Sequence, residues 1–342
     1  MLTALMHGSR HYWTLHSLPP RRMERRLTVA ARWFAEKITR EQVAAAHVVF
    51  TSDAMNLADL FRSIPALARK PSVVYFHENR LRGHAPLQHD PLELVNLNTI
   101  LAATQAWFNS QYHYDEFLRR CEAVVRRHRE LQNRDVMEQV APKCLYVTPP
   151  VELRHESADS ASPTGQPGEA AGRRDVHEVF ADLRGVETRN LVPALVQLRD
   201  GGEDFHLTAI GRPDALDTSF SFTPLDERDG DKIMAAISRA GVYLSIRTEA
   251  FSDELLLHAL AAGCWPIVPE AGCYPEVLPA MLHLSCLHDS SVEGIMTRLM
   301  ESKQADRPES YEQAVWERLS VFDAVAACRI IDDRLEALAA RK

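Results

Sequence analysis

Short apolar runs alternate with amphipathic stretches along the first half of the chain. The apolar runs predict strands over residues 47–51 (HVVFT), 72–76 (SVVYF), 106–108 (AWF) and 144–147 (CLYV). Apolar residues at helical spacing predict helices over residues 56–62, 92–103 and 112–131. Strands that are apolar throughout and are separated by helices are typical of a parallel sheet covered on both faces.

The second half repeats this alternation. Its apolar runs predict strands over residues 205–210 (FHLTAI), 242–246 (VYLSI) and 265–268 (WPIV). Helices are predicted over residues 190–199, 231–240 and 253–262, and helical patterns dominate from there to the C-terminus. Together the halves predict an α/β protein of two doubly wound, Rossmann-like domains, with a ligand site in the cleft between them.

A polar stretch separates the two halves. Residues 156–174 (ESADSASPTGQPGEAAGRR) are dominated by Ser, Ala, Gly and Pro and contain no large apolar residue. Such a stretch cannot bury enough surface to offset the entropy lost on ordering. We therefore expect an N-terminal domain over 1–153, a flexible linker over 154–176 and a C-terminal domain over 177–342. The last helix is expected to pack back on the N-terminal domain.

The composition is that of a soluble globular protein. Of the 342 residues, 46% are hydrophobic and 25% are charged, which excludes disorder over the whole chain. No apolar run is long enough to cross a membrane, and the first residues lack the pattern of a signal peptide. The six cysteines are scattered and form no C-x-x-C pair, so we expect neither disulfides nor a structural zinc site. These features predict a cytoplasmic protein with no membrane partner.

Charge is divided unequally between the halves. Residues 1–150 hold 20 Lys and Arg against 14 Asp and Glu (net +6), and residues 151–342 hold 19 against 33 (net −14). A basic half suggests a polyanionic partner such as a nucleic acid backbone, and a chance imbalance on solvated faces is the alternative. The arginines that suggest such a surface are Arg21, Arg22, Arg25, Arg26, Arg119, Arg120, Arg126, Arg127 and Arg129.

Polar residues follow two neighbouring predicted strands of the first half. His77, Glu78 and Asn79 come directly after strand 72–76, and Asn109 and Ser110 come after strand 106–108. In open parallel sheets, ligands bind beyond the carboxyl ends of the strands. The His77 imidazole could exchange a proton or bind a sugar hydroxyl there. Capping of the next helix and hydrogen bonds to loop backbone are the structural alternatives.

The second half carries a comparable edge over residues 248–276. Ser252 lies near the start of the predicted helix 253–262, whose N-terminus would suit a phosphate, although Asp253 brings a negative charge to the same place. Glu249 could hold sugar hydroxyls, and Glu276 follows a second turn near this edge.

Arginines near the same edge are candidates for binding a diphosphate. Arg212 follows Gly211 at the end of strand 205–210, and Arg184 and Arg189 precede the helix over 190–199. Either Arg189 or Arg212 could neutralise a diphosphate, and a solvated surface arginine is the alternative for each. No defensible metal-ligand spacing is present, and neither G-x-S-x-G, Walker A nor G-x-G-x-x-G occurs.

Three segments of the first half resemble the queuosine-tRNA mannosyltransferase family. They are residues 15–26 (LHSLPPRRMERR), 50–81 (FTSDAMNLADLFRSIPALARKPSVVYFHENRL) and 97–118 (LNTILAATQAWFNSQYHYDEFL). Residues 242–279 are similar to the nucleotide-sugar domain of retaining GT-B glycosyltransferases. The resemblance implies a GT-B fold, with two Rossmann-like domains facing across a cleft. It also implies retaining transfer of mannose from GDP-mannose to queuosine in a tRNA anticodon, without a bound metal and with no cofactor besides the sugar nucleotide, which is a substrate.

The resemblance also implies roles for individual residues. His77, Glu78 and Asn79 match the family's HEN motif at the sugar site, which assigns His77 to orienting the transferred sugar. Asn109 and Ser110 match its NS pair on the acceptor side of the cleft. The donor-binding candidates are Arg189, Gly211, Arg212, Glu249, Ser252, His258 and Glu276, of which Arg189 stands at a phosphate-binding Lys position and Glu276 at the Glu after the second glycine loop.

The chain departs from the family pattern in three ways. The usual Glu-x7-Glu pair is replaced by Ala250 and His258, with Glu249 displaced by one position. Asp253 stands at a loop glycine, and the family's first strand with its Ser-His loop would precede the present Met1. Two alternatives to the queuosine reaction therefore remain: a catalytically impaired homologue that binds tRNA or a nucleotide, and a GT-B glycosyltransferase with another acceptor.

Overall fold

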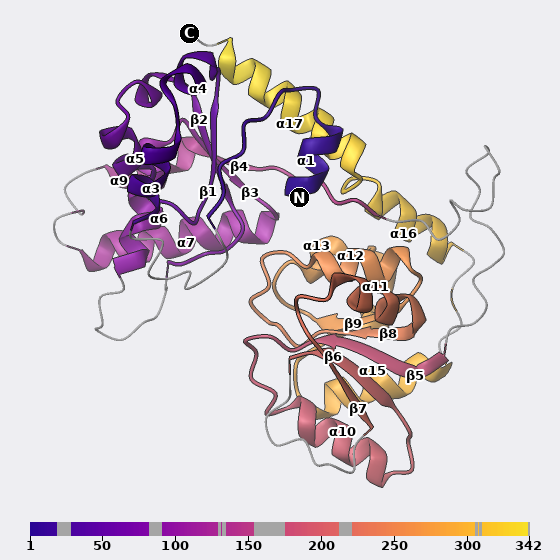
Figure 1. Cartoon of the computed structure of the whole chain (residues 1–342). Coiled ribbons are helices and arrows are strands. Elements are labelled where there is room, and N and C mark those ends of the chain that lie inside the picture. The colour runs from indigo at the N-terminus through magenta and orange to yellow at the C-terminus, as the bar shows by residue number, and fades with distance from the viewer. Residues whose placement is uncertain are drawn as a thin grey trace, which may run out of the picture. The chain divides into compact units, whose positions relative to one another are not determined.

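A computed structural model describes residues 1–18, 29–81, 91–128, 131, 135–153, 175–211, 221–304, 307 and 310–340. The chain divides into two compact units, each of which is considered by itself (Figure 1). Unit 1 comprises residues 1–150 and 324–342, and unit 2 comprises residues 151–323. Most of the predicted linker, residues 154–174, lies outside the described residues, and the first strand of unit 2 begins at Asp175.

Unit 1 contains a parallel sheet of four described strands in the order β1-β2-β3-β4. The strands are β1 (Val49–Ser52), β2 (Ser72–Phe76), β3 (Gln105–Phe108) and β4 (Cys144–Tyr146). The helices are α1 (Leu2–Gly8), α3 (Ala30–Lys37), α4 (Arg40–Ala45), α5 (Leu57–Ser63), α6 (Pro91–Ala102), α7 (Gln111–Arg127), α9 (Val136–Val140) and α17 (Ala324–Ala339). All four strands predicted from the apolar runs are confirmed, β2 with the same bounds.

Strand β2 of unit 1 is buried throughout because both faces of the sheet are covered. Val74, Phe76 and Phe108 belong to a buried cluster with side chains of α5, α6 and α7. Tyr75 and Trp107, one position along, belong to a second cluster on the opposite face. This alternation follows from the two-residue period of a strand.

The second face of this sheet is covered by elements from both ends of the sequence. Leu5 of α1 and Ile331 and Leu335 of α17 belong to the cluster that contains Tyr75 and Trp107. Helices α1 and α17 lie side by side (Figure 1). Unit 1 is therefore built from the first 150 residues together with the last helix.

Unit 2 contains a parallel sheet of six described strands in the order β10-β9-β8-β5-β6-β7. The strands are β5 (Asp175–Asp182), β6 (His206–Ile210), β7 (Phe222–Leu225), β8 (Ala240–Leu244), β9 (Trp265–Pro269) and β10 (Leu287–His288). The helices are α10 (Leu191–Asp200), α11 (Gly230–Arg239), α12 (Glu254–Ala261), α13 (Tyr274–Val277), α14 (His283–Cys286), α15 (Val292–Gln304) and α16 (Tyr311–Leu319).

The strand order of unit 2 reverses at β5. From β5 the chain proceeds outward through β6 and β7, and then returns to place β8 on the other side of β5. Helices α10 and α15 pack against each other, and α11, α12 and α16 cover the opposite face (Figure 1). Ligands of doubly wound sheets bind beyond the carboxyl ends of the strands at such a reversal. The topology therefore predicts a ligand site at the loops after β5 and β8.

Candidate functional site

At the edge of unit 1, the three residues after β2 differ in exposure. His77 and Glu78 are exposed, and Asn79 is half-buried. The Asn79 side chain accepts a hydrogen bond from the Leu81 backbone N–H at 2.9 Å, so it shapes its own loop. The His77 ring lies 5.1 Å from the Tyr75 ring, measured between centroids. The imidazole is thus held beside an aromatic residue and faces solvent at the carboxyl edge of the sheet.

The two polar residues after β3 are buried and have partners within unit 1. Ser110 Oγ accepts from the His113 backbone N–H at 3.0 Å and is the N-cap of α7, so the capping interpretation of Ser110 is confirmed. Asn109 donates from Nδ2 to the His77 carbonyl oxygen at 3.2 Å. The fold therefore brings Asn109 against His77, as the shared sheet edge predicts.

The arginines of α7 are largely paired on their own helix. Arg119 contacts Glu116, with its Nε 2.7 Å from Oε2, and Arg126 contacts Glu122 at 2.5 Å. Arg120 is 8% exposed and also contacts Glu116. The described part of the predicted basic surface is therefore partly neutralised by neighbouring carboxylates, and Arg21, Arg22, Arg25, Arg26 and Arg129 lie outside the described residues.

At the edge of unit 2, a cavity of about 390 Å³ lies at the reversal of strand order. It is lined by the loop after β5, the start of α10, the loop after β8 and two residues near α15. The lining residues are Gly185, Val186, Glu187, Arg189, Asn190, Leu191, Ile246, Arg247, Thr248, Glu249, Ser290 and Ile295. Two predicted donor-binding residues, Arg189 and Glu249, are thus brought to one cavity.

A buried carboxylate holds two arginines at this edge. Asp182, the last residue of β5, is 2% exposed. It accepts two side-chain hydrogen bonds from Arg184, at 2.9 and 2.7 Å, and lies 3.5 Å from Arg247 Nη1. These bonds raise the pKa of Arg184, so its charge is permanent. The two guanidiniums are held in place with further N–H groups that can bind an anion.

Arg247 and Asp182 were not among the predicted site residues. Arg247 is the first charged residue beyond strand β8 and directly follows the predicted strand 242–246, as His77 directly follows the predicted strand 72–76. The rule that identified His77 therefore applies equally to Arg247. Asp182 sits at the end of an unpredicted strand, so no sequence pattern marked it as an anchor.

The rim of the cavity is fixed by a hydrogen-bonded chain of polar groups. Asn190 Nδ2 donates to the Ser290 carbonyl oxygen at 2.8 Å. The Ser290 backbone N–H donates to His288 Nδ1 at 3.0 Å, and His288 Nε2–H donates to the Ser245 carbonyl oxygen at 2.9 Å. Burial lowers the pKa of His288, so the ring is neutral and can both accept and donate. The ends of β8 and β10 are tied together by this ring.

Other predicted donor-binding residues lie outside the described lining of this cavity. They are Gly211, Ser252, His258 and Glu276, and Arg212 lies outside the described residues. Gly211 has a φ of +84°, and a Cβ there would lie 3.2 Å from the Leu183 carbonyl carbon. Glycine at this position lets β6 end tightly against the loop that carries Arg184.

The N-terminus of α12 is capped by a buried carboxylate. Asp253, rather than Ser252, is the N-cap, and its Oδ1 accepts from the Leu256 backbone N–H at 3.0 Å. Its Oδ2 accepts from the hydroxyls of Tyr243 and Tyr274 at 2.8 and 3.1 Å. Burial raises the pKa of Asp253. The charge that the sequence places near a phosphate therefore points into the core of unit 2.

The loop after β9 closes against the loop before α12. Gly272 has a φ of +64°, and a Cβ there would lie 2.8 Å from the Ala250 carbonyl oxygen. The same carbonyl accepts from the Cys273 backbone N–H at 2.9 Å. Ala250, which the sequence resemblance places at the first glutamate of the family pair, is 4% exposed. Ala250 thus lies in a packed contact between the two loops.

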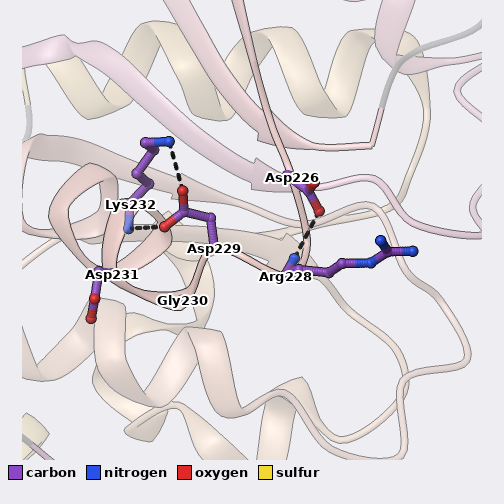
Figure 2. Close-up of a pocket in the computed structure, with 6 residues that line it drawn as sticks. All are labelled: Asp226, Arg228, Asp229, Gly230, Asp231 and Lys232. Carbon is purple, nitrogen blue, oxygen red and sulfur yellow. Dashed lines mark hydrogen bonds and ion pairs between the residues drawn. The ribbon is translucent and has the colours of Figure 1, made fainter. Parts of the chain in front are cut away.

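A second hollow, of about 510 Å³, lies beyond the end of β7 (Figure 2). Its walls carry Asp226, Arg228, Asp229 and Lys232. Lys232 Nζ lies 2.6 Å from Asp229 Oδ2, and the Arg228 backbone N–H donates to Asp226 at 2.9 Å, while the Arg228 side chain extends away (Figure 2). The carboxylates of Asp226 and Asp229 are used in the loop and in the cap of α11, and the hollow is lined by none of the predicted donor-binding residues.

Over the described ranges, no group of three or more His, Cys, Asp and Glu side chains is arranged to hold a metal ion. No helix among the described residues is long and apolar enough to cross a membrane. All six cysteines are buried, and none of them forms a disulfide bond.

Comparison with known proteins identifies the first half of the chain. Residues 1–151 match a family model described as tRNA-queuosine alpha-mannosyltransferase N-terminal. The tRNA-queuosine alpha-mannosyltransferase of Drosophila melanogaster is 27% identical over 297 residues, which cover 82% of this chain and 78% of the relative.

Solved structures match the whole architecture. Sucrose-phosphate synthase from Thermosynechococcus elongatus has a TM-score of 0.61 at 12% identity, over 96% of this chain and 82% of that one. The catalytic domain of starch synthase IV from Arabidopsis thaliana has a TM-score of 0.61 at 11% identity, over 97% and 81%. OtsA has a TM-score of 0.62 at 12% identity, over 91% and 77%. These likenesses establish the GT-B fold. The N-terminal 151 residues therefore match the tRNA-queuosine alpha-mannosyltransferase family, and the chain as a whole has the GT-B fold.

Proposed function

We propose that the protein transfers mannose from GDP-mannose to queuosine in tRNA, with retention of configuration and without a bound metal ion. The observation that carries this proposal is the match of residues 1–151 to the N-terminal domain of the tRNA-queuosine alpha-mannosyltransferases. The similar enzyme from Drosophila melanogaster, which aligns with 82% of the chain, supports the same reaction. We place the reaction in the cytoplasm.

The cavity of unit 2 supports binding of the sugar nucleotide. When the bond between the anomeric carbon and the diphosphate oxygen breaks, negative charge grows on the diphosphate. Arg184 and Arg247, fixed by Asp182, and the more exposed Arg189 supply permanent positive charge for it. Glu249 lines the same cavity and is assigned to hydroxyls of the sugar or ribose, as are His258 and Glu276. The starch synthase with the same fold was solved with ADP bound.

The edge of unit 1 supports binding of the transferred sugar. His77 is exposed at the end of β2, and its backbone is held by Asn109. An imidazole in this position can donate to, or accept from, a sugar hydroxyl. The acceptor hydroxyl forms the new bond to the anomeric carbon on the face that the diphosphate leaves, and its proton passes to the departing diphosphate. The net charge of +6 over residues 1–150 supports an encounter with tRNA.

A second candidate is favoured by one observation. The sequence resemblance places Ala250 and His258 at the positions of the family's glutamate pair, and Ala250 is buried in a loop contact. A homologue that binds tRNA or a nucleotide without transferring sugar would carry such changes. Salt-sensitive binding of tRNA in the absence of transfer would favour this candidate.

Transfer of labelled mannose tests the proposal directly. The full chain is incubated with GDP-mannose and either queuosine-containing tRNA or the same tRNA without queuosine. We expect label only in the first, and its loss in His77→Ala. Equal label in both tRNAs would point to another acceptor. A folded sample that binds no GDP- or UDP-sugar would exclude the glycosyltransferase reading of the site.

A further inference from the structure

His77 is held at both of its backbone polar groups. Its N–H donates to Asp53 Oδ1 at 3.0 Å, and its carbonyl oxygen accepts from Asn109 Nδ2 at 3.2 Å. Asp53 follows β1 and Asn109 follows β3, the two strands that flank β2. The two contacts therefore reach His77 from opposite sides. The peptide is fixed by buried groups while the imidazole stays exposed.

The amide of Asn109 is itself oriented by a buried histidine. His113 Nδ1 lies 2.8 Å from Asn109 Oδ1. Because Asn109 Nδ2 donates to the His77 carbonyl, Asn109 Oδ1 faces His113 and accepts a hydrogen bond from Nδ1–H. His113 is fully buried, and its ring centroid lies 5.1 Å from that of Phe108. Burial lowers the pKa of His113 to about 3, so the ring keeps one defined neutral form near pH 7.

The same arrangement continues along the loop. The Asp53 carbonyl oxygen accepts from Asn96 Nδ2 at 3.3 Å, and Asn96 Oδ1 accepts from the Arg80 backbone N–H at 3.1 Å. Asn96 is fully buried on α6. The backbone of the loop after β2 is thus hydrogen-bonded to buried side chains both at His77 and at Arg80.

Stability alone does not account for a carboxylate in this place. Asp53 is 4% exposed, and burial raises its pKa to about 6, so ionisation of this side chain in the folded unit is costly. An apolar side chain would avoid that cost. What the carboxylate provides is an acceptor for the N–H of the residue that carries the exposed imidazole.

We propose that Asp53 and Asn109 are positioning residues for His77, with His113 setting the orientation of the Asn109 amide. The inference rests on the proposed function, because it assigns these residues to the placement of the imidazole on the transferred sugar. A displacement of about 1 Å at a reacting centre can lower a rate about 100-fold. The hydrogen bonds of the His77 backbone with Asp53 and Asn109, which we call the clamp, prevent such a displacement.

Substitutions on the two sides of the clamp test the proposal through kinetics. Asp53→Ala and Asn109→Ala are expected to lower kcat by about 10- to 100-fold with little change in the KM for GDP-mannose. Asp53→Asn keeps an oxygen for the His77 N–H and is expected to restore most of kcat. The matched controls are Asp115→Ala and Asn98→Ala, which remove exposed side chains of the same types. Wild-type kcat in both test variants, or a loss in Asp53→Asn as large as in Asp53→Ala, would overturn the proposal.

Amide exchange tests the clamp without any need for transfer activity. Hydrogen exchange of the His77 N–H is followed in the full chain by NMR or by mass spectrometry of peptides that span β2 and its loop. We expect it to accelerate at least about 10-fold in Asp53→Ala, because the N–H loses its partner, and to stay unchanged in Asp115→Ala. Unchanged exchange in Asp53→Ala would refute the clamp even if the enzyme is active.

The two readouts separate the clamp from the proposed function. If the wild type transfers no sugar while the exchange result holds, the reaction is wrong and the clamp stands. Binding of GDP by calorimetry and the melting curve identify a variant that has failed to fold. Should Asp53→Ala be such a variant, Asn109→Ala and Asp53→Asn carry the test.

Discussion

The buried carboxylate of Asp53 gives unit 1 a pH dependence of known sign. Burial raises its pKa from the ordinary 3.8 to about 6, and the His77 N–H and the charge of Arg80 oppose this rise. In the unfolded chain the group loses its proton near pH 4, whereas in the folded unit it keeps the proton until about pH 6. Ionisation inside the fold therefore costs stability, which falls as pH rises from about 4 to about 6 and is level above that.

The size of the effect follows from the two pKa values. A difference of about two pH units corresponds to roughly 3 kcal/mol of unfolding free energy. Asp53→Asn has no ionisable group at this position, so its unfolding free energy does not fall by this amount as pH rises. The stability of the variant, measured relative to the wild type, is expected to rise by about 3 kcal/mol between pH 4 and pH 7.

Urea unfolding of both proteins at intervals over this range measures the change. Carboxylates shared by the two proteins cancel in the difference, and Asp115→Asn, at an exposed position, is the control that should show no trend. The carbon-13 shift of the Asp53 carboxyl reports the same proton directly. A stability difference that is constant over the range, or a titration midpoint below pH 4.5, would refute the reasoning.

Three further substitutions test other parts of the structure. Arg247→Ala should weaken GDP binding about 10-fold or more in calorimetry, since a hydrogen bond to a charged group contributes about 1.5–3 kcal/mol, and Arg228→Ala should leave it unchanged. Gly272→Ala should lower unfolding free energy by about 1–3 kcal/mol because its φ is positive and a Cβ would meet the preceding loop, whereas Gly230→Ala, in open space, should not. Ile331→Ala, fully buried on α17, should cost about 2–5 kcal/mol in the thermal unfolding of unit 1; an equal melting curve would contradict its place in that core.

The sequence predicts most strands of both sheets because they are buried on both faces. β2 (SVVYF) is fully buried and was predicted with its true bounds. β5 (DVHEVFAD) was not predicted as a strand, because its first half is polar and partly exposed and it directly follows the polar stretch. β7 contains Pro224 and lies at the edge of its sheet, where a proline is tolerated but the pattern is weak. β10 has only two residues.

The sequence predicts those residues of the candidate site that directly follow buried strands. It does not predict the residues whose orientation depends on contacts with distant parts of the chain. His77 and Asn109 were found by their place after buried strands, and they are in contact. Asp253 was interpreted as a charge near a phosphate, but two tyrosine hydroxyls from distant elements turn it inward. Local sequence contains no information on which side chains will reach a given carboxylate. Arg247, by contrast, directly follows the predicted strand 242–246, so its place at the carboxyl edge of the sheet can be inferred from the sequence alone.

The place of α17 in unit 1 affects how the protein is made. The chain leaves unit 1 after residue 150 and returns at residue 324, and the two crossings are joined by a hydrogen bond from the Val151 N–H to the Phe322 carbonyl oxygen. During synthesis the face of the sheet that carries Tyr75 and Trp107 lacks its α17 cover until more than 170 further residues have been translated. A nascent chain with this apolar surface exposed is a substrate for chaperones. A stop codon or protease cut just before α17 would leave unit 2 entire and unit 1 unfinished.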